Sequence, residues 1–260
     1  MNFIQPIITI WRREIIRYWR DKTRIVSSFF QPIMFLFIFG AGLSSTLTQG
    51  NFGIDFIKFI YPGIIAMNVM GIAFFSTVST VWDREFGFLK EILVAPIPRT
   101  SISIGKALGA TTIASLQALI LLIIAPFIGV QLHILVVLQL FALMILLSFA
   151  ISGIGLLIAS LMKRTETFGL VMQVLVFPMF FLSGAFFPLT NVPTWMTIIS
   201  RVNPLTYGVD AMRRTILNGE IPQQVLSRLV IYPIMVNVLF LIGFSAVMIS
   251  IAVIAFNRKD

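Results

Sequence analysis

The chain has 260 residues, of which 58% are hydrophobic and 11% are charged, and its mean hydropathy is +0.99. Soluble domains carry roughly 25% charged residues, so this composition predicts an integral membrane protein. Cysteine is absent, which excludes disulfides, a thiolate nucleophile and a cysteine metal site.

The net charge of +9 is distributed along the chain as membrane topology requires. Most basic residues fall before the first apolar run, after the second, after the fourth and at the C-terminus. This alternation fits the positive-inside rule with both termini in the cytoplasm, an N-in/C-in arrangement. Nucleic-acid binding is a poor explanation, because the basic residues are not gathered on one soluble face.

Residues 1–24 are predicted to form an amphipathic helix that lies in the membrane interface. Ile4, Ile8, Trp11, Ile15 and Tyr18 make an apolar stripe, and the basic residues lie elsewhere on the helical wheel. Such a helix places its arginines among anionic headgroups. A simple topology anchor and a contact with a partner protein are equally compatible with this pattern. The basic residues of the segment are Arg12, Arg13, Arg17, Arg20, Lys22 and Arg24.

The longest charged interruption between apolar runs is the stretch 82–99, and it also has helical order. Trp82, Phe86, Leu89 and Leu93 form one stripe of a helix, which we expect to pack on the membrane spans. Pro96 and Pro98 should end this helix, because proline lacks an amide donor. The stretch is either a solvated connector or a helix that a soluble partner displaces. On the wheel, Asp83, Arg84, Gly87, Lys90 and Glu91 occupy the other side, and Glu85 lies at the edge between the two sides.

Six membrane spans are predicted from the apolar runs, so the fold class is an all-α integral membrane protein with a single transmembrane domain, 1–260. In the third span, Gly105 and Gly109 form a GxxxG pair that permits close helix approach, most often as a packing feature. The spans are 25–47, 58–81, 101–130, 134–162, 168–187 and 229–256.

The segment 188–228 contains too many charges for a further span, yet it has the pattern of two short helices. Pro193 can begin the first, and Asn203 and Pro204 supply an N-cap and a first-turn proline for the second. Leu205, Val209, Met212 and Ile216 then form an apolar stripe. We therefore expect a re-entrant helical hairpin at 190–217 in the outer leaflet.

The chain lacks the residues that would let it power transport or catalysis by itself. No ionisable residue lies near the centre of a predicted span, which disfavours an ion-coupled carrier. The single histidine, His133, lies in an outer turn and cannot form a metal site alone. Gly105 and Lys106 lack the remaining residues of a phosphate-binding loop. If transport is energised, the energy comes from another chain.

Three stretches resemble the membrane-spanning subunit, or permease, of type 2 ABC exporters, a family of drug, lipid and polysaccharide exporters. Arg84-Glu85-Phe86-Gly87, continuing through Leu89, Leu93, Pro96 and Gly105-Lys106, is similar to the family's first cytoplasmic loop. Residues 181–189, FLSGAFFPL, resemble its fifth span and the following turn, and residues 203–213, NPLTYGVDAMR, resemble its C-terminal signature. The resemblance covers nearly the whole chain.

The resemblance implies a role for each part. The helix 83–98 would be a cytoplasmic coupling helix seated in an ATP-binding subunit, and the interfacial helix 1–24 would touch the same subunit. The hairpin would close the outer end of the path. The implied coupling residues are Arg84, Glu85, Gly87, Lys90 and Glu91; the interfacial residues are Trp11, Arg12, Arg13 and Arg17; the outer-gate residues are Gly184, Pro188, Asn203, Pro204, Tyr207, Asp210 and Arg213.

The family further implies two ATP-binding subunits and two permease copies, here expected as a homodimer in the plasma (inner) membrane. ATP and Mg would bind the partner subunit, and this chain would bind no cofactor or metal and would not itself be an enzyme. The phenylalanine content favours a lipophilic or amphipathic substrate, such as a drug or lipid. A lipid-linked polysaccharide exporter, an ion-coupled carrier and a membrane scaffold are the alternatives.

Overall fold

Long helices bundled side by side make up the computed structural model, which describes residues 3–47, 56–94 and 97–258. No β-strand occurs among these residues. Residues 48–55, which lie between the first two predicted spans, and Pro96, which is predicted to help end a helix, lie outside them. The elements are α1 (Ile4–Arg20), α2 (Lys22–Leu47), α3 (Phe56–Glu85), α4 (Phe88–Val94), α5 (Arg99–Leu122), η1 (Ala125–Ile128), α6 (Ile134–Leu161), α7 (Thr165–Phe181), η2 (Leu189–Asn191), α8 (Thr194–Val202), α9 (Pro204–Leu217), α10 (Gln223–Leu229) and α11 (Ile234–Arg258).

Four helical stretches are long and apolar enough to cross a membrane: Phe56–Glu85, Arg99–Leu122, Ile134–Leu161 and Gln223–Phe256. The all-helical class is therefore confirmed. The count of six spans remains a prediction, since α7 is a shorter apolar helix of 17 residues and part of α2 lies outside the described side chains.

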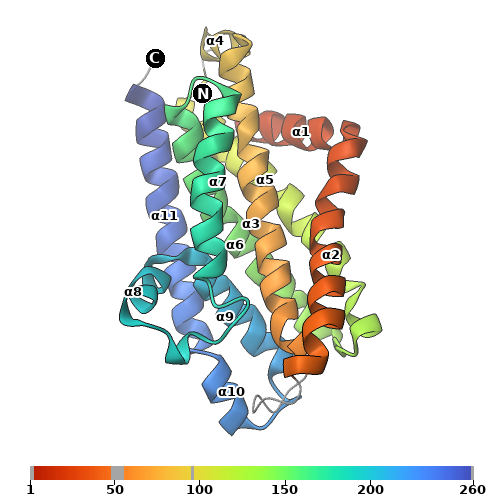
Figure 1. Ribbon diagram of the computed structural model, residues 1–260. Helices are drawn as coiled ribbons and strands as arrows, with labels where there is room; N and C mark the ends of the chain where they lie inside the picture. Colours follow the sequence, from red (N-terminus) through yellow and green to blue (C-terminus); the bar gives the residue numbers. More distant parts are fainter. Residues whose placement is uncertain (1–2, 48–55, 95–96, 259–260) are drawn as a thin grey trace.

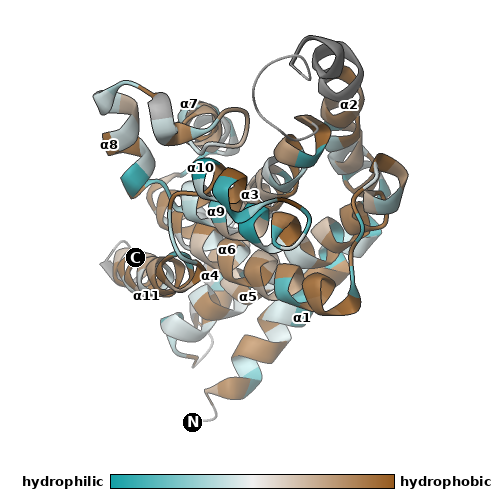
Figure 2. Cartoon of the chain, turned by 90° about the horizontal axis from the view of Figure 1, so that it is seen from below, coloured by the Kyte–Doolittle hydropathy of each residue, from teal (hydrophilic) through white to brown (hydrophobic). Residues whose placement is uncertain are grey.

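The centre of the bundle is α3, which packs against α2, α5, α6, α7 and α9. Its core includes large apolar side chains that are fully buried, such as Ile60, Ile65 and Phe74. From the α8–α10 end, α9 and α10 lie over the middle of the bundle, and α2, α7 and α11 lie around its edge (Figure 2). Since α3 has neighbours on most sides, movement of α3 would displace most of the bundle.

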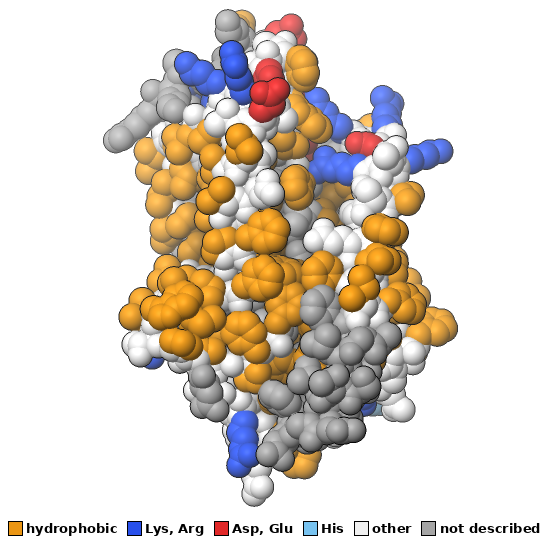
Figure 3. Space-filling model, viewed as in Figure 1, with side chains coloured by type: hydrophobic (Ala, Val, Ile, Leu, Met, Phe, Trp, Pro, Cys, Tyr) orange, Lys and Arg blue, Asp and Glu red, His pale blue; other side chains and the backbone are white. Residues whose placement is uncertain are grey.

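The two ends of the bundle differ in content. Both chain termini and α4 lie at one end, where α1 crosses the bundle, and α8, α9 and α10 lie at the other (Figure 1). On the face shown in Figure 3, hydrophobic side chains cover the middle, and most of the visible Lys and Arg side chains gather near α4 and along α1. This separation agrees with the predicted placement of both termini on one side. Orientation in the membrane stays a prediction.

Candidate functional site

Helix α1 lies directly on α5 at the two glycines of the predicted GxxxG pair. A Cβ atom added to Gly105 would lie 2.9 Å from Cβ of Ile10, and one added to Gly109 would lie 2.7 Å from Cβ of Glu14. Real side chains do not approach so closely, so only glycine permits this crossing. Close helix approach at this pair is confirmed, and its partner is the interfacial helix α1 rather than a neighbouring span.

Two hydrogen bonds run along the same contact. The Trp11 indole N–H donates to Oγ1 of Thr112 at 3.0 Å, and the Tyr18 hydroxyl donates to Oε1 of Gln117. Burial raises the pKa of the Tyr18 phenol above its ordinary value, so the hydroxyl keeps its proton and remains a donor. These bonds fix the position of α1 along α5.

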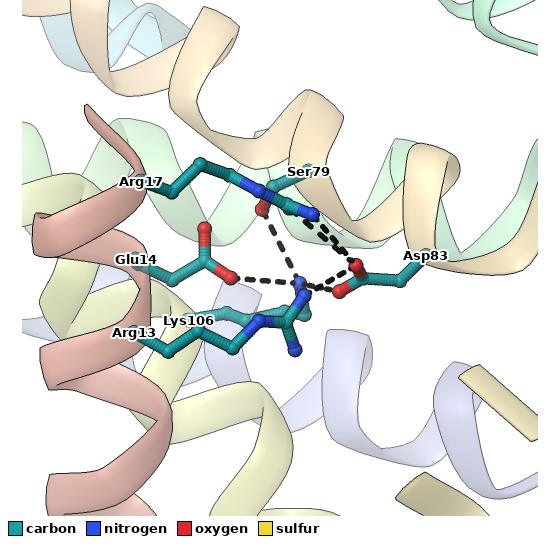
Figure 4. A network of polar contacts seen from close by, with 6 residues as sticks. All are labelled: Arg13, Glu14, Arg17, Ser79, Asp83 and Lys106. Atoms are coloured by element: carbon teal, nitrogen blue, oxygen red, sulfur yellow. Dashed lines mark hydrogen bonds and ion pairs between the residues drawn. The ribbon is translucent and has the colours of Figure 1, made fainter. Parts of the chain in front are cut away.

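A buried network of charged side chains joins α1, α3 and α5, and we call it the α1–α3–α5 junction (Figure 4). The Lys106 ammonium of α5 lies 2.6 Å from Oδ2 of Asp83 and 3.2 Å from both Oε1 of Glu14 and Oγ of Ser79. The Lys106 and Asp83 side chains are each only 1% exposed. Lys106 is thus bonded to both neighbouring helices. The junction comprises Arg13, Glu14, Arg17, Ser79, Asp83 and Lys106.

Two arginines of α1 complete the junction. Arg13 pairs with Oδ1 of Asp83 through Nη2, and both terminal nitrogens of Arg17 lie 3.4 Å from the same oxygen. The junction therefore holds three cations and two carboxylates. Breaking one buried pair would leave the other charge uncompensated, so sliding of α1 against α3 or α5 is strongly opposed.

Helix α4 is attached to this junction by packing. Leu89 is buried in a small cluster with Ile10 of α1, Ile102 of α5 and Phe256 of α11. The guanidinium carbon of Arg13 lies 4.6 Å from the centroid of the Phe88 ring, a cation–π contact. A force applied to α4 would therefore reach α1 and α5 at once.

The prediction of one continuous coupling helix over residues 83–98 is wrong. Helix α3 ends at Glu85, and Gly87 has a φ of +80°, in the left-handed region that glycine tolerates. A new helix, α4, starts at Phe88. Because the turn resets the helical wheel, Phe86 is 80% exposed instead of packing on the spans.

The last two residues of α3 bond to the turn between α6 and α7. Arg84 donates through Nη1 to the carbonyl oxygens of Ser160 and Met162, both at 2.8 Å, where α6 ends. Glu85 accepts from the amide N–H of Thr165 at 3.0 Å and from its hydroxyl. Both side chains are thus engaged within the chain, and a role for them at a partner surface remains a prediction.

The other predicted coupling and interfacial residues are placed as follows. Glu91 and Arg12 are exposed, and Gly87 forms the turn before α4. Trp11 and Arg13 contact α5, α3 and α4 as described, and Arg17 reaches Asp83. The side chain of Lys90 lies outside the described part of the structure.

A second polar cluster lies at the opposite end, around the buried helix α9. The Asp210 carboxylate accepts from the amide N–H groups of Ile231 and Tyr232, at 2.7 and 3.1 Å. It also accepts from Nδ2 of Asn237 at 2.9 Å. These bonds connect α9 to the beginning of α11.

Arg213 ties α9 to two further segments. It donates to the carbonyl of Gly184 at 2.8 Å, and its guanidinium carbon lies 4.0 Å from the centroid of the Phe59 ring. Gly184 has a φ of +78°, so the turn after α7 depends on glycine. Helix α9 is therefore bonded to α3, α11 and the turn after α7.

The remaining residues of the predicted outer gate lie at or near helix ends. The Asn203 side chain accepts from the amide of Leu205, so the predicted N-cap is confirmed, and Pro204 occupies the first turn. Tyr207 donates to the carbonyl of Arg201 at 2.7 Å. Pro188 lies just before η2. Whether this region re-enters a membrane stays a prediction.

The structure thus brings the predicted residues together in two groups at opposite ends of the bundle. Sequence reasoning missed Glu14, Asp83 and Lys106 as one unit. The available signal was an acid at the end of one apolar run and a base near the start of the next, which a short connection brings side by side. Among the described residues, no group of three or more His, Cys, Asp or Glu side chains could hold a metal.

Apolar helices of this length, bundled around α3, define a multi-pass membrane protein of the inner membrane. Residues 5–217 match the model of the ABC-2 type transporter family. The chain belongs to this family, and is a transport permease.

Three relatives illustrate the similarity. A chain named as a transport permease, ycf38 of Cyanophora paradoxa, is 32% identical over 214 residues, covering 81% of this chain and 74% of the relative. Nodulation protein J of Rhizobium leguminosarum bv. viciae is 27% identical over 218 residues, covering 82% and 83%. YbhR of Escherichia coli (strain K12), named as a multidrug ABC transporter permease, is 31% identical over 175 residues, covering 64% and 46%. The family implies an ATP-binding subunit as partner, with ATP hydrolysis belonging to that subunit.

Proposed function

We propose that this permease exports a lipophilic or amphipathic substrate, drug-like or lipid-like, driven by movement of an ATP-binding subunit against α4. The complex contains two permease copies and two ATP-binding subunits, with ATP and Mg on the latter. The name of YbhR, a multidrug permease, supports the substrate class. The single observation that carries the mechanism is the α1–α3–α5 junction with α4 packed on it.

The mechanism follows from the contacts that link α4 to α1, α5 and α3, and α3 to α9. ATP binding draws the ATP-binding subunits together and displaces α4. Leu89 and Phe88 pass this displacement to α1 and α5, and the ion pairs of Lys106 pass it to α3. Helix α3 contacts α9 at the opposite end, where Arg213 lies against Phe59. A displacement at the α4 end is thereby converted into opening around α9.

Two exposed side chains, Phe86 in the turn before α4 and Val94 at the end of α4, provide the test. Phe86 is 80% exposed and Val94 is 86% exposed, so their truncation removes little packing within the permease. We expect Phe86→Ala and Val94→Ala each to reduce co-purification of the ATP-binding subunit and substrate-stimulated ATP hydrolysis severalfold. Removing an exposed apolar side chain from an interface weakens binding to the partner and leaves packing within the permease intact.

A matched control is Phe127→Ala, because Phe127 is 86% exposed but lies in η1, after α5 has run to the other end of the bundle. This variant should leave association and stimulation unchanged. Equal behaviour of the Phe86 and Val94 variants and the control would contradict the proposed docking of α4. Uptake of a fluorescent lipophilic dye into inverted vesicles, abolished without ATP, tests the substrate class.

A further inference from the structure

Helix α2 contains a proline that interrupts its backbone hydrogen bonding. The regular bond of an α-helix joins a carbonyl oxygen to the amide N–H four residues later. In α2 the residue four positions after Ser28 is Pro32, which has no amide N–H and whose ring crowds the Ser28 carbonyl. Helix α2 nevertheless continues to Leu47, and Pro32 is buried. The Ser28 carbonyl can therefore accept a donor from outside its own helix in place of the regular bond.

Asn68 of α3 supplies such a donor. Its Nδ2 atom donates to the Ser28 carbonyl oxygen at 3.2 Å. Asn68 lies near the middle of α3 and is only 8% exposed. Within the described part of the chain, its Oδ1 atom is buried without a hydrogen-bond partner. Because an amide is costly to bury without a bond, the contact with Ser28 is what accommodates Asn68 in this apolar helix.

The two parts of α2 on either side of Pro32 contact different regions of the bundle. Before Pro32, α2 follows directly on α1, at the α4 end (Figure 1). Beyond it, the centroid of the Phe35 ring lies 6.0 Å from that of Phe180 in α7 and 6.2 Å from that of Phe186. Phe186 belongs to the turn after α7, which α9 bonds at the Gly184 carbonyl. The outer part of α2 is thus connected to the cluster around α9.

The packing of α2 leaves room for it to bend. It packs mainly against α3, and it lies at the edge of the bundle (Figure 2). Two large side chains on either side of Pro32 are exposed, Phe30 to 67% and Phe37 to 69%. Sharp bends in helices occur most often at proline. A helix that is held along one side and lacks a backbone bond at Ser28 can bend there without moving the rest of the bundle.

We propose that α2 bends at Pro32 when the path opens, and that Asn68 is the positioning residue that holds α2 against α3 until it does. The bend breaks one side-chain hydrogen bond, because Pro32 has already removed the backbone bond at Ser28. The outer part of α2 then moves with the turn after α7, which α9 also contacts. This role in opening rests on the proposed function, whereas the pairing of Asn68 with the proline site does not.

A double-mutant cycle tests the pairing. The purified permease is compared by thermal unfolding in detergent as wild type, Asn68→Leu, Pro32→Ala and the double variant. Pro32→Ala gives the Ser28 carbonyl a backbone N–H, so the Asn68 amide is no longer required. We expect Asn68→Leu to lower the unfolding midpoint by about 2–4 °C more with Pro32 present than in the Pro32→Ala background, as for one hydrogen bond. Equal shifts in the two backgrounds would overturn the pairing.

Gln139→Leu is the matched control for this cycle. Gln139 is an exposed amide of α6, and its side chain forms no hydrogen bond with the described residues. Its replacement should change the unfolding midpoint equally with Pro32 and in the Pro32→Ala background. Coupling as large as that of Asn68 would mean that the cycle reports something other than the Ser28 bond, and would also overturn the pairing.

Activity of the complete transporter separates a positioning role from a purely structural one. Loss of the Asn68 bond should favour the open conformation, so Asn68→Leu should raise ATP hydrolysis without substrate severalfold, whereas simple loss of stability would lower it. Pro32→Ala should reduce ATP-driven dye uptake severalfold without lowering the unfolding midpoint. Unchanged uptake in Pro32→Ala, or unchanged hydrolysis in Asn68→Leu, would overturn the hinge. The thermal cycle uses the permease alone and Phe86→Ala reports docking of the ATP-binding subunit, so failure of the proposed function is recognised separately.

Discussion

Lys106 is the side chain on which α1, α3 and α5 converge, and its position explains why a base is found inside an apolar helix. Its three donors reach Asp83, Glu14 and Ser79, so no donor is left over for solvent. The adjacent Gly105 allows α1 to approach closely enough for Glu14 to join the network. Charge and close packing at this point depend on each other.

Replacing Lys106 with methionine should destabilise the permease by about 3 kcal/mol, because the buried Asp83 and Glu14 lose their shared cation. Arg13 and Arg17 remain near Asp83, but they are partly exposed and do not bond to Glu14 in the structure. The measurement is thermal unfolding in detergent. Glu14→Gln combined with Lys106→Met should recover part of the loss, and a single variant as stable as the wild type would contradict a buried ion pair.

The charged residues show what sequence alone can and cannot provide at this scale. Arg84, Glu85 and Lys106 could be singled out from the sequence because they match a motif of the family. Their partners were not predictable, because Arg84 bonds to backbone carbonyls near the end of α6 and Lys106 to a carboxylate on α1. Such contacts join residues about 76 and 92 positions apart, and periodicity reports only neighbours on one helix.

At the scale of whole elements, α1 has surroundings that its sequence pattern does not predict. The alternation of apolar and basic residues predicts a helix at a membrane surface, and the helix itself is present. Its buried face includes Glu14, a charged residue that a purely lipid-facing stripe would not contain. The contact with α5 therefore makes α1 part of the bundle and not only an anchor.

Gly109→Ala tests this docking. The added Cβ would lie 2.7 Å from Cβ of Glu14, an atom that cannot move without α1, so α1 must shift away. We expect a loss of about 1–3 kcal/mol in stability and weaker coupling to the ATP-binding subunit. The matched control is Gly71→Ala in α3, because no atom lies within 4 Å of the added Cβ there. Comparable losses in the two variants would argue against α1 docking as the cause.

The break between α3 and α4 illustrates why element boundaries are less predictable than element types. Trp82, Phe86, Leu89 and Leu93 match one helical stripe, and the flanking segments are indeed helical. Gly87 divides them by adopting a φ of +80°, a conformation that glycine permits but does not require. After the break, Leu89 packs against Ile10 and Ile102, a tertiary contact that helical periodicity does not report.

For the molecule as a whole, composition and charge were sufficient to predict a helical membrane protein, and the family model confirms its class. The two polar clusters could not be located relative to each other from sequence. The structure places them at opposite ends of α3, with the α1–α3–α5 junction near Asp83 and the α9 cluster near Phe59. In the proposed mechanism, the end near Asp83 receives the displacement and the end near Phe59 opens.

Orientation in the membrane follows from the same separation and can be tested with single cysteines, since the chain has none. Lys163, in the α6–α7 turn, and Gln224, in α10, are both exposed and lie toward opposite ends. With both termini inside the cell, a membrane-impermeant maleimide added to intact cells should label Gln224→Cys and spare Lys163→Cys. Permeabilised cells should be labelled at both positions, which controls for the reactivity of each thiol. Labelling of Lys163→Cys in intact cells, with Gln224→Cys protected, would reverse the orientation and place α4 outside, where no ATP-binding subunit could reach it.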